Sequence, residues 1–164
     1  MAHEAVRQTF RPSRIRVLFV GESPPANGAF FYLGSPMTKY MWKVFSGVTQ
    51  ADFGSRDEFL DFFKREGCFL DDLSHDPVDN VKNKSQRRSI LDGCVNALAE
   101  RMREYKPEFV VAVLKSIEDQ VCRAAELANL QVPVYAVPFP GQGNQRRFVE
   151  ELSRILGALY ASRQ

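Results

Sequence analysis

Four short apolar runs, separated by amphipathic segments, constrain the fold of this chain most strongly. The runs cover residues 16–20, 68–73, 109–114 and 134–137. The short, continuous character of residues 16–20 and 109–114 predicts strands that are buried on both faces, and residues 68–73 and 134–137 are interpreted as two further strands. Strands that alternate with helices predict right-handed crossovers and a parallel sheet. We therefore expect an α/β fold, a three-layer α/β/α sandwich with a central four-stranded parallel sheet, forming a single domain over residues 1–164.

The segments between these runs carry helix signals. Ser35 precedes Pro36 as a capping hydroxyl, and Ser55 with Glu58 forms a capping-box pattern. These signals predict helices that begin at Pro36 and just after Ser55. Apolar residues at helical spacing predict one long helix over 85–105. Two further helices are expected over 116–128 and 144–161.

Composition places the chain among ordinary globular proteins. Of its 164 residues, 45% are hydrophobic and 26% are charged, which are normal values for such a protein. Its apolar runs fall far short of the roughly 18 to 20 residues that a membrane helix needs. The first 14 residues lack the apolar core of a secretion signal. We expect a cytoplasmic or nuclear protein that binds no membrane and is a monomer.

The cysteines argue against a metal centre. Cys68, Cys94 and Cys122 are widely spaced and form no C-x-x-C pair. This spacing does not suit a zinc site, an iron–sulfur cluster or a disulfide framework. We therefore expect neither a metal nor another cofactor.

Positive charge is concentrated in two places, although the net charge is only +2. The stretches VKNKSQRR (81–88) and NQRR (144–147) both lie where a helix is predicted to begin. Cations at a helix N-terminus oppose the helix dipole, so helix stability does not explain them. They are either a solvated surface or contacts for phosphate groups.

The loop after the first strand is the strongest candidate for a functional site, because ligands of open parallel sheets bind at the carboxyl ends of the strands. Gly21 allows a sharp turn there, and two prolines then stiffen the chain. Glu22 and Ser23 would thus be held at the mouth of the strand, which suits a general base or a group that orients water. A serine hydrolase is not expected, because GESPP lacks the final glycine of a nucleophile elbow.

Other loops at the same edge offer groups that could bind a ligand. Phe30 and Phe31 present flat apolar faces that could stack on a ring, although core packing is the commoner role of such residues. Asp71, Asp72 and His75 could form hydrogen bonds, although a lone histidine is more often structural. The glycine-flanked turn before the last helix could hold a phosphate at the helix N-terminus.

Several stretches together resemble the uracil-DNA glycosylase superfamily. GESPP (21–25) is similar to its first motif, Gly-Glu-Ala-Pro-Gly or Gly-x-Asn-Pro-Gly, and YMWKVF (40–45) is similar to an aromatic helix of the mismatch-specific branch. CFLDDLSHDP, YKPEFVVAVLKS and VYAVPFPGQGNQRRF follow in the family's order. The resemblance extends from residue 14 to about residue 156. It implies the family's fold and its activity, in which a base is flipped from DNA and its N-glycosidic bond is hydrolysed.

The resemblance implies catalytic roles for the first loop. Glu22 would orient or deprotonate the water that attacks C1′ of the sugar. Ser23 stands where family members carry a catalytic Asp or Asn, which is a departure from the pattern. Phe31, or its neighbour Phe30, would stack on the flipped base.

The resemblance also implies which residues read the base. Asp71, or Asp72 if the alignment slips by one, replaces the family's base-reading asparagine, and His75 lies nearby. An ionised aspartate only accepts hydrogen bonds, so it would favour a base that presents a donor, such as an exocyclic amine, over uracil.

The last motif is implied to hold the DNA strand. The expected contacts are the backbone amides and side chains of Gly141, Gln142, Asn144, Arg146 and Arg147. The histidine that usually begins this motif is absent, and Phe139 or Pro138 takes its place. Branches with an iron–sulfur cluster need four cysteines, one more than this chain has.

Three functions remain open from the sequence. The first is a glycosylase that releases a modified, deaminated or mismatched base from DNA. The second is a DNA-binding or nucleotide-binding protein that keeps the fold without catalysis, because Ser23 and the missing histidine remove two usual catalytic helpers. The third is an enzyme that acts on a free nucleoside or nucleotide.

Overall fold

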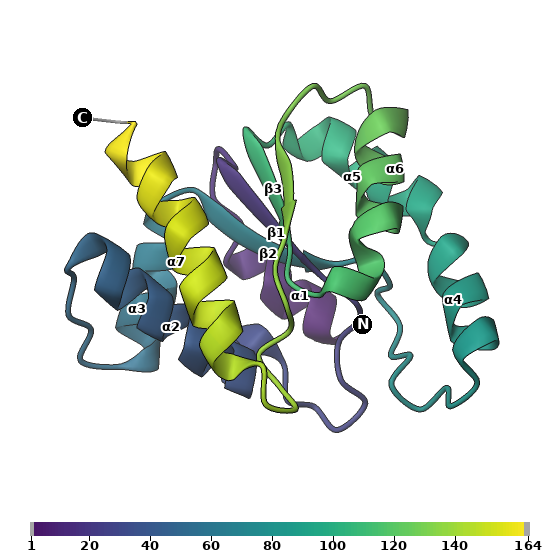
Figure 1. Cartoon of the computed structure of the whole chain (residues 1–164), viewed down its shortest axis with the longest axis horizontal. Helices are drawn as coiled ribbons and strands as arrows, with labels where there is room; N and C mark the ends of the chain where they lie inside the picture. Colours follow the sequence, from purple (N-terminus) through teal and green to yellow (C-terminus); the bar gives the residue numbers. More distant parts are fainter. Residues whose placement is uncertain (1, 163–164) are drawn as a thin grey trace.

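All four strands form one parallel sheet in the computed structural model, which describes residues 2–162 (Figure 1). The strand order is β2-β1-β3-β4, and the strands are β1 (Val17–Gly21), β2 (Cys68–Asp72), β3 (Phe109–Ala112) and β4 (Val134–Ala136). The predicted α/β fold with a four-stranded parallel sheet is confirmed. The ends of the predicted domain, residue 1 and residues 163–164, lie outside the described residues.

Seven α-helices flank the sheet within residues 2–162: α1 (Ala2–Thr9), α2 (Pro36–Thr49), α3 (Arg56–Arg65), α4 (Lys84–Asp92), α5 (Val95–Tyr105), α6 (Glu118–Leu127) and α7 (Gln145–Ala161). Figure 1 shows α2, α3 and α7 on one side of the sheet and α5 and α6 on the other. None of these helices has the length and apolar character that crossing a bilayer requires.

The two predicted N-caps are confirmed. The Ser35 hydroxyl accepts a hydrogen bond from the Thr38 backbone N–H at 3.3 Å. The Ser55 hydroxyl accepts one from the Glu58 backbone N–H at 3.2 Å. Because each cap satisfies a helix N–H that lacks an intrahelical acceptor, the local sequence fixes where α2 and α3 begin.

One helix was not predicted, and one helix prediction is wrong. Helix α1 forms before the first strand, and its Arg7 donates a hydrogen bond of 3.0 Å to the Leu70 carbonyl of β2. The long helix predicted over 85–105 is interrupted at Gly93 and Cys94, which separates α4 from α5. The two helices differ in burial, because Leu91 is the one residue buried on α4 whereas α5 buries five. With so little apolar surface on α4, packing does not hold it in line with α5, and the glycine at position 93 is a poor residue for a helix interior.

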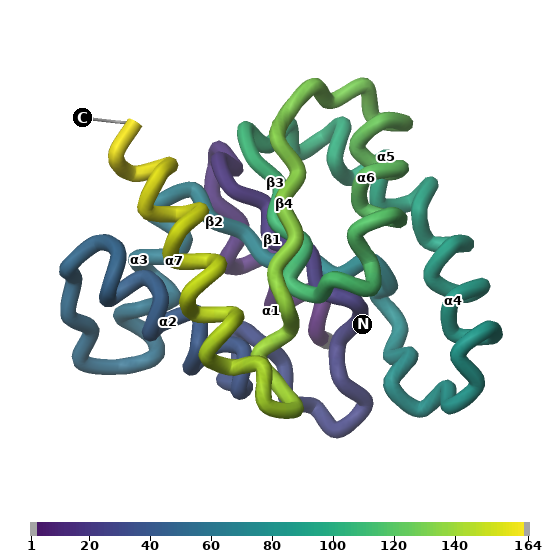
Figure 2. The backbone as a smooth tube through the Cα atoms, viewed as in Figure 1, coloured from purple at the N-terminus to yellow at the C-terminus, as the bar shows by residue number. Residues whose placement is uncertain are grey.

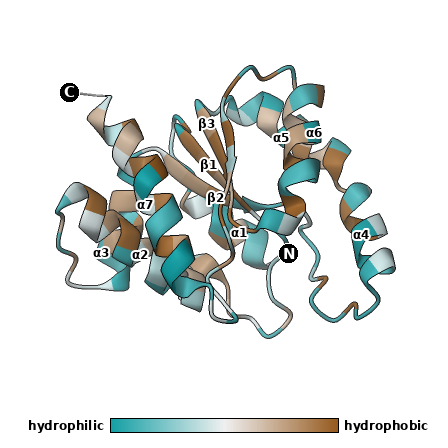
Figure 3. Cartoon of the chain, viewed as in Figure 1, coloured by the Kyte–Doolittle hydropathy of each residue, from teal (hydrophilic) through white to brown (hydrophobic). Residues whose placement is uncertain are grey.

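The sheet forms the centre of the core. Leu18, Phe19 and Val20 of β1 are fully buried, and the strands are among the most hydrophobic parts of the chain (Figure 3). The backbone trace shows β4 beside β3 at the far edge from β2 (Figure 2). Strand β1 lies between β2 and β3, so the chain reverses its direction across the sheet there. Such a reversal opens a crevice at the carboxyl ends of the two central strands.

Candidate functional site

A pocket of about 510 Å³ occupies this crevice. Every strand contributes to it near its carboxyl end: Ser23 follows β1, Asp72 ends β2, Val113 follows β3 and Phe139 follows β4. Its volume falls in the range of about 300–1,000 Å³ that is typical of small-ligand sites. The prediction of where ligands should bind therefore coincides with a real cavity.

The walls of the pocket are mainly apolar and aromatic. Phe30, Phe31, Tyr40 and Phe139 supply the rings. Phe139 is 46% exposed, which leaves much of its ring free for contact with a ligand. Asp72 is the one acidic or basic side chain among the described lining residues. A planar apolar ligand with one polar edge fits this combination of surfaces.

Asp72 is held in the pocket wall from behind. Its Oδ2 accepts a hydrogen bond of 2.9 Å from the Arg7 guanidinium, which is itself 1% exposed. Burial raises the pKa of the Asp72 carboxyl, and the charge and hydrogen bond of Arg7 counter this effect only in part. Asp72 thus presents a carboxyl group of fixed orientation to the cavity.

Gly21 pairs with Asp72 across β1 and β2, and its lack of a side chain makes room for the carboxyl group. A Cβ at Gly21 would lie 2.5 Å from Asp72 Oδ1. Because Arg7 restrains Asp72, Gly21→Ala is expected to lower the free energy of unfolding by about 1–3 kcal/mol, measured by urea denaturation.

Gly157→Ala is the matched control for Gly21→Ala, since a Cβ there meets nothing within 4 Å. Gly157 lies in α7, so alanine should raise stability by up to about 1 kcal/mol. Equal effects at the two positions would contradict the close approach at Gly21.

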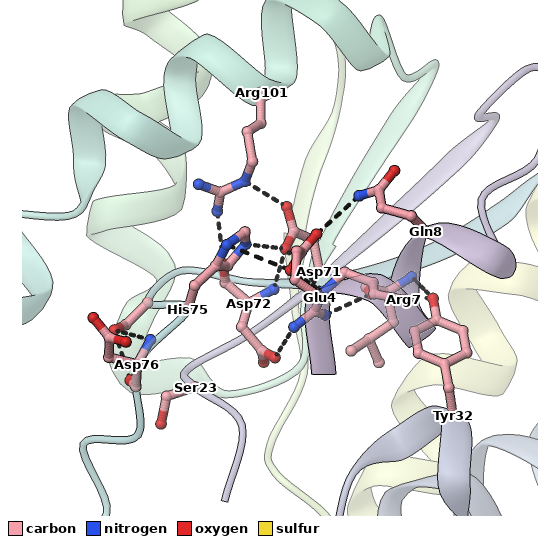
Figure 4. A network of polar contacts seen from close by, with 12 residues as sticks. Glu4, Arg7, Gln8, Ser23, Tyr32, Asp71, Asp72, His75, Asp76 and Arg101 are labelled. Carbon is pink, nitrogen blue, oxygen red and sulfur yellow. Dashed lines mark hydrogen bonds and ion pairs between the residues drawn. The ribbon is translucent and has the colours of Figure 1, made fainter. Parts of the chain in front are cut away.

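Asp71 lies outside the pocket lining, in a buried polar network (Figure 4). Its Oδ2 accepts a hydrogen bond of 2.7 Å from Arg101, and its Oδ1 lies 2.8 Å from His75 Nε2. The Tyr105 hydroxyl contacts Oδ2 at 3.3 Å. Burial alone would raise the pKa of Asp71, but the His75 hydrogen bond and the charges of Arg101 and Arg7 outweigh it and lower that pKa well below its usual range. Of the two aspartates in the predicted alignment, Asp72 is the one that lines the cavity.

His75 also belongs to this network and does not line the pocket. Its Nδ1 lies 3.4 Å from Glu4 Oε2, so it joins the loop after β2 to α1. Ligand atoms of Glu4, Asp71 and His75 all lie within 4.8 Å of one another, a spacing that could hold a metal ion. Arg7 binds the Glu4 carboxylate and Arg101 binds the Asp71 carboxylate. Cations therefore already balance these negative charges, as is typical of an ion-pair network.

Of the two predicted catalytic residues, one lines the pocket and the other does not. Glu22 lies outside the pocket lining, and its Oε1 accepts a hydrogen bond from the Arg87 guanidinium of α4. Ser23 does line the pocket, and its hydroxyl accepts a hydrogen bond of 3.2 Å from the Val78 backbone N–H. The loop after β1 is thereby tied to the segment that leads into α4.

Phe30 and Phe31 combine a core role with a place in the pocket wall. They are 1% and 4% exposed. The Phe30 ring stacks on His3 with centroids 4.5 Å apart, and the Arg7 guanidinium carbon lies 5.0 Å from its centroid. Both rings are therefore rigidly placed, and their use as a stacking platform stays a prediction.

The predicted strand-holding residues before and on α7 are only partly at the pocket. Gly141 lines it, whereas Gln142, Asn144 and the two arginines do not. Arg146 pairs with Glu150 at 2.8 Å, and Arg147 pairs with Glu151 at 3.6 Å. Each arginine already has an acidic partner one turn along the same helix.

Sequence reasoning missed the residues that support the pocket from outside. Arg7 of α1 and Arg101 of α5 lie far apart in the chain and meet around Asp71 and Asp72 (Figure 4). Tyr105, one turn after Arg101 on α5, also contacts Asp71. The one available signal was the spacing of Glu4, Arg7 and Gln8, which places all three on one face of a helical turn.

Comparison with models of known protein families gives no match, and a search of curated proteins finds no significantly similar sequence.

Proposed function

We propose that this chain is a DNA glycosylase-like protein with the three-layer architecture of the uracil-DNA glycosylase superfamily. In this proposal a modified, deaminated or mismatched base is extruded from DNA into the pocket, and its N-glycosidic bond is hydrolysed. Water adds to C1′ of the sugar, the C1′–N bond breaks, and the base leaves with the proton. The resemblance of the sequence motifs motivates the substrate class.

The observation that carries the proposal is the pocket itself. It lies at the carboxyl ends of the strands, its walls are aromatic, and Asp72 is the single acidic group among its described lining residues. A flipped base needs flat apolar contacts on its faces and a hydrogen-bonding partner at its edge. Phe139 and Asp72 can supply these two contacts.

Asp72 bears on which base would be bound. As a carboxylate it accepts hydrogen bonds only, so it pairs with an N–H donor on the edge of the base. Bases that present an amino or imino group toward Asp72 are the preferred substrates in this proposal. Glu22 would act on the water, provided that its carboxylate leaves Arg87.

Strand scission after alkali treatment tests the proposal. Labelled oligonucleotides would carry uracil, hypoxanthine, xanthine, hydroxymethyluracil, or a G·T, G·U or adenine mismatch. We expect cleavage of at least one substrate, and a lower rate with Phe139→Ala because a stacking surface is removed. Cleavage that is equally fast in Phe139→Ala would separate the activity from this pocket. Release of a base from free nucleosides without any from DNA would favour a nucleoside enzyme.

The ion pair of Glu22 with Arg87 favours a second candidate function. With its carboxylate engaged outside the pocket lining, Glu22 is not poised for catalysis. The same pocket would then bind an extruded base or a nucleotide without cleaving it. DNA binding without strand scission on any of the substrates would select this candidate.

A further inference from the structure

Helix α4 and the residues before it carry a cluster of cations that the proposed catalytic scheme leaves unused. We call Lys82, Lys84, Arg87 and Arg88 the α4 basic cluster. Lys82, Lys84 and Arg88 are exposed, and Arg87 is half-buried. Leu91 is the one residue of α4 that is buried. In Figures 1 and 2 the helix lies at the outer side of the molecule, away from α2, α3 and α7.

This arrangement of charge does not stabilise α4. Lys84 is the first residue of the helix, where cations oppose the helix dipole. Lys84 and Arg88 are four residues apart, so their like charges repel on the helix surface. Within residues 2–162, no carboxylate lies within ion-pair distance of Lys82, Lys84 or Arg88, and Asp92, which also interacts with the charge of Arg88, is bound to Arg123 at 2.6 Å. A bound anion would remove this unfavourable electrostatic energy.

The two candidate basic regions differ in this respect. On α7, Arg146 and Arg147 pair with Glu150 and Glu151 of the same helix. Any phosphate would have to compete with those carboxylates, whereas the lysines of the α4 basic cluster have no such competitor among the described residues. Free cations bind phosphate with the larger net gain, so α4 is the better site for a polyanion.

Three contacts join the loop after β1 to the α4 basic cluster and to the segment that leads into it. Arg87 hydrogen-bonds the Glu22 carboxylate. The Val78 N–H donates to the hydroxyl of Ser23, a pocket residue. The Ala26 N–H donates to the Asp79 carboxylate at 3.2 Å. The loop at the pocket and the segment leading into α4 therefore form one connected surface.

We propose that the α4 basic cluster binds the phosphodiester backbone of the DNA strand whose base enters the pocket. This rests on the proposed function, because that function makes DNA the ligand. Arg87 joins the two sites: its Nε has no hydrogen-bond partner among the described residues, and its contact with Glu22 can be exchanged for a phosphate oxygen. That exchange releases the Glu22 carboxylate when DNA is bound.

Binding of labelled DNA, measured by fluorescence anisotropy between about 50 and 200 mM salt, tests this proposal. The variant is Lys84→Gln/Arg88→Gln, compared with the wild type on single-stranded and duplex oligonucleotides. If both side chains contact phosphates, the slope of log affinity against log salt should fall by about 2 in magnitude, one unit per contact. The affinity at about 150 mM salt should fall roughly tenfold.

Arg14→Gln/Arg103→Gln is the matched control. It removes the same charge from exposed residues that lie near the amino ends of β1 and β3, opposite the pocket. We expect its slope and affinity to match the wild type. Equal changes in the two double variants, or no change in the α4 variant, would overturn the proposal.

The two experiments together distinguish failure of the α4 proposal from failure of the proposed glycosylase function. DNA binding that depends on α4, with no base released from any oligonucleotide, would retain the α4 surface and reject the glycosylase. Base release with an α4 variant that binds like the wild type would retain the glycosylase and reject the α4 surface. A wild-type protein that does not bind DNA would overturn the α4 proposal as well.

Discussion

Arg7→Met is expected to lower the free energy of unfolding by about 3–5 kcal/mol, because it leaves buried acids without their cation. Arg7 is 1% exposed. It donates to Asp72 Oδ2 at 2.9 Å and to the Leu70 carbonyl at 3.0 Å, and its Nε donates to Glu4 at 3.0 Å. Methionine fills a similar volume but supplies none of these contacts. Urea denaturation at neutral pH, followed by circular dichroism, measures the change.

The double variant Arg7→Met/Asp72→Asn separates charge from packing. If the loss arises from the unbalanced Asp72 carboxylate, removing that charge should restore part of the stability. Arg146→Met serves as the surface control, since this arginine is 89% exposed and pairs only with Glu150. Its unfolding midpoint should equal that of the wild type. A single variant Arg7→Met that unfolds like this control would show that α1 contributes no essential cation.

Arg7 also connects α1 to the proposed site. The same side chain orients Asp72 and lies over the ring of Phe30, and both of these residues line the pocket. Helix α1 therefore supports two residues of the pocket lining through Arg7. A chain that lacks α1 should lose both stability and the shape of the pocket.

Under the proposed glycosylase function, Glu22→Gln is expected to reduce base release by at least about 100-fold while DNA affinity is retained. A positioned general base contributes about 10² to 10⁴ in rate, and glutamine cannot take a proton from water. Single-turnover strand scission at saturating DNA isolates the chemical step, and fluorescence anisotropy reports affinity. Affinity should be equal or slightly higher, because Arg87 then lacks a carboxylate that competes with phosphate.

Glu58→Gln is a suitable comparison for Glu22→Gln, because Glu58 is an exposed acid at the start of α3. It should release the base at the wild-type rate. Unchanged activity in Glu22→Gln would remove Glu22 from the mechanism. Loss of both DNA affinity and activity in that variant would indicate a role in the structure of the loop after β1.

Local sequence signals predicted the sheet and most of the helices. The strand β1 and its fully buried residues follow from a continuous apolar run, and the starts of α2 and α3 follow from Ser35 and Ser55. These features depend on residues a few positions apart, so they can be recognised in the sequence. The single helix predicted over 85–105 failed because burial, which differs between α4 and α5, is not a local property.

The strand topology predicted from the sequence located the candidate site, but the sequence did not predict the contacts within it. The parallel order of strands placed Ser23, Asp72 and Gly141 at one edge, and the pocket contains all three. The sequence could not distinguish Asp71 from Asp72, because neighbouring residues of a strand point to opposite faces and the register decides which one meets the cavity. It also gave no sign that Arg87 binds Glu22, a contact between residues 65 positions apart.

The sequence by itself determined that this chain builds a parallel sheet with polar and aromatic loops at the carboxyl ends of its strands. Only the tertiary structure decided which of these groups share a cavity and which are bound elsewhere. The physical reason is that apolar periodicity and capping act over a few residues, whereas the ion pairs of Arg7, Arg87 and Arg101 form only after distant segments have packed together.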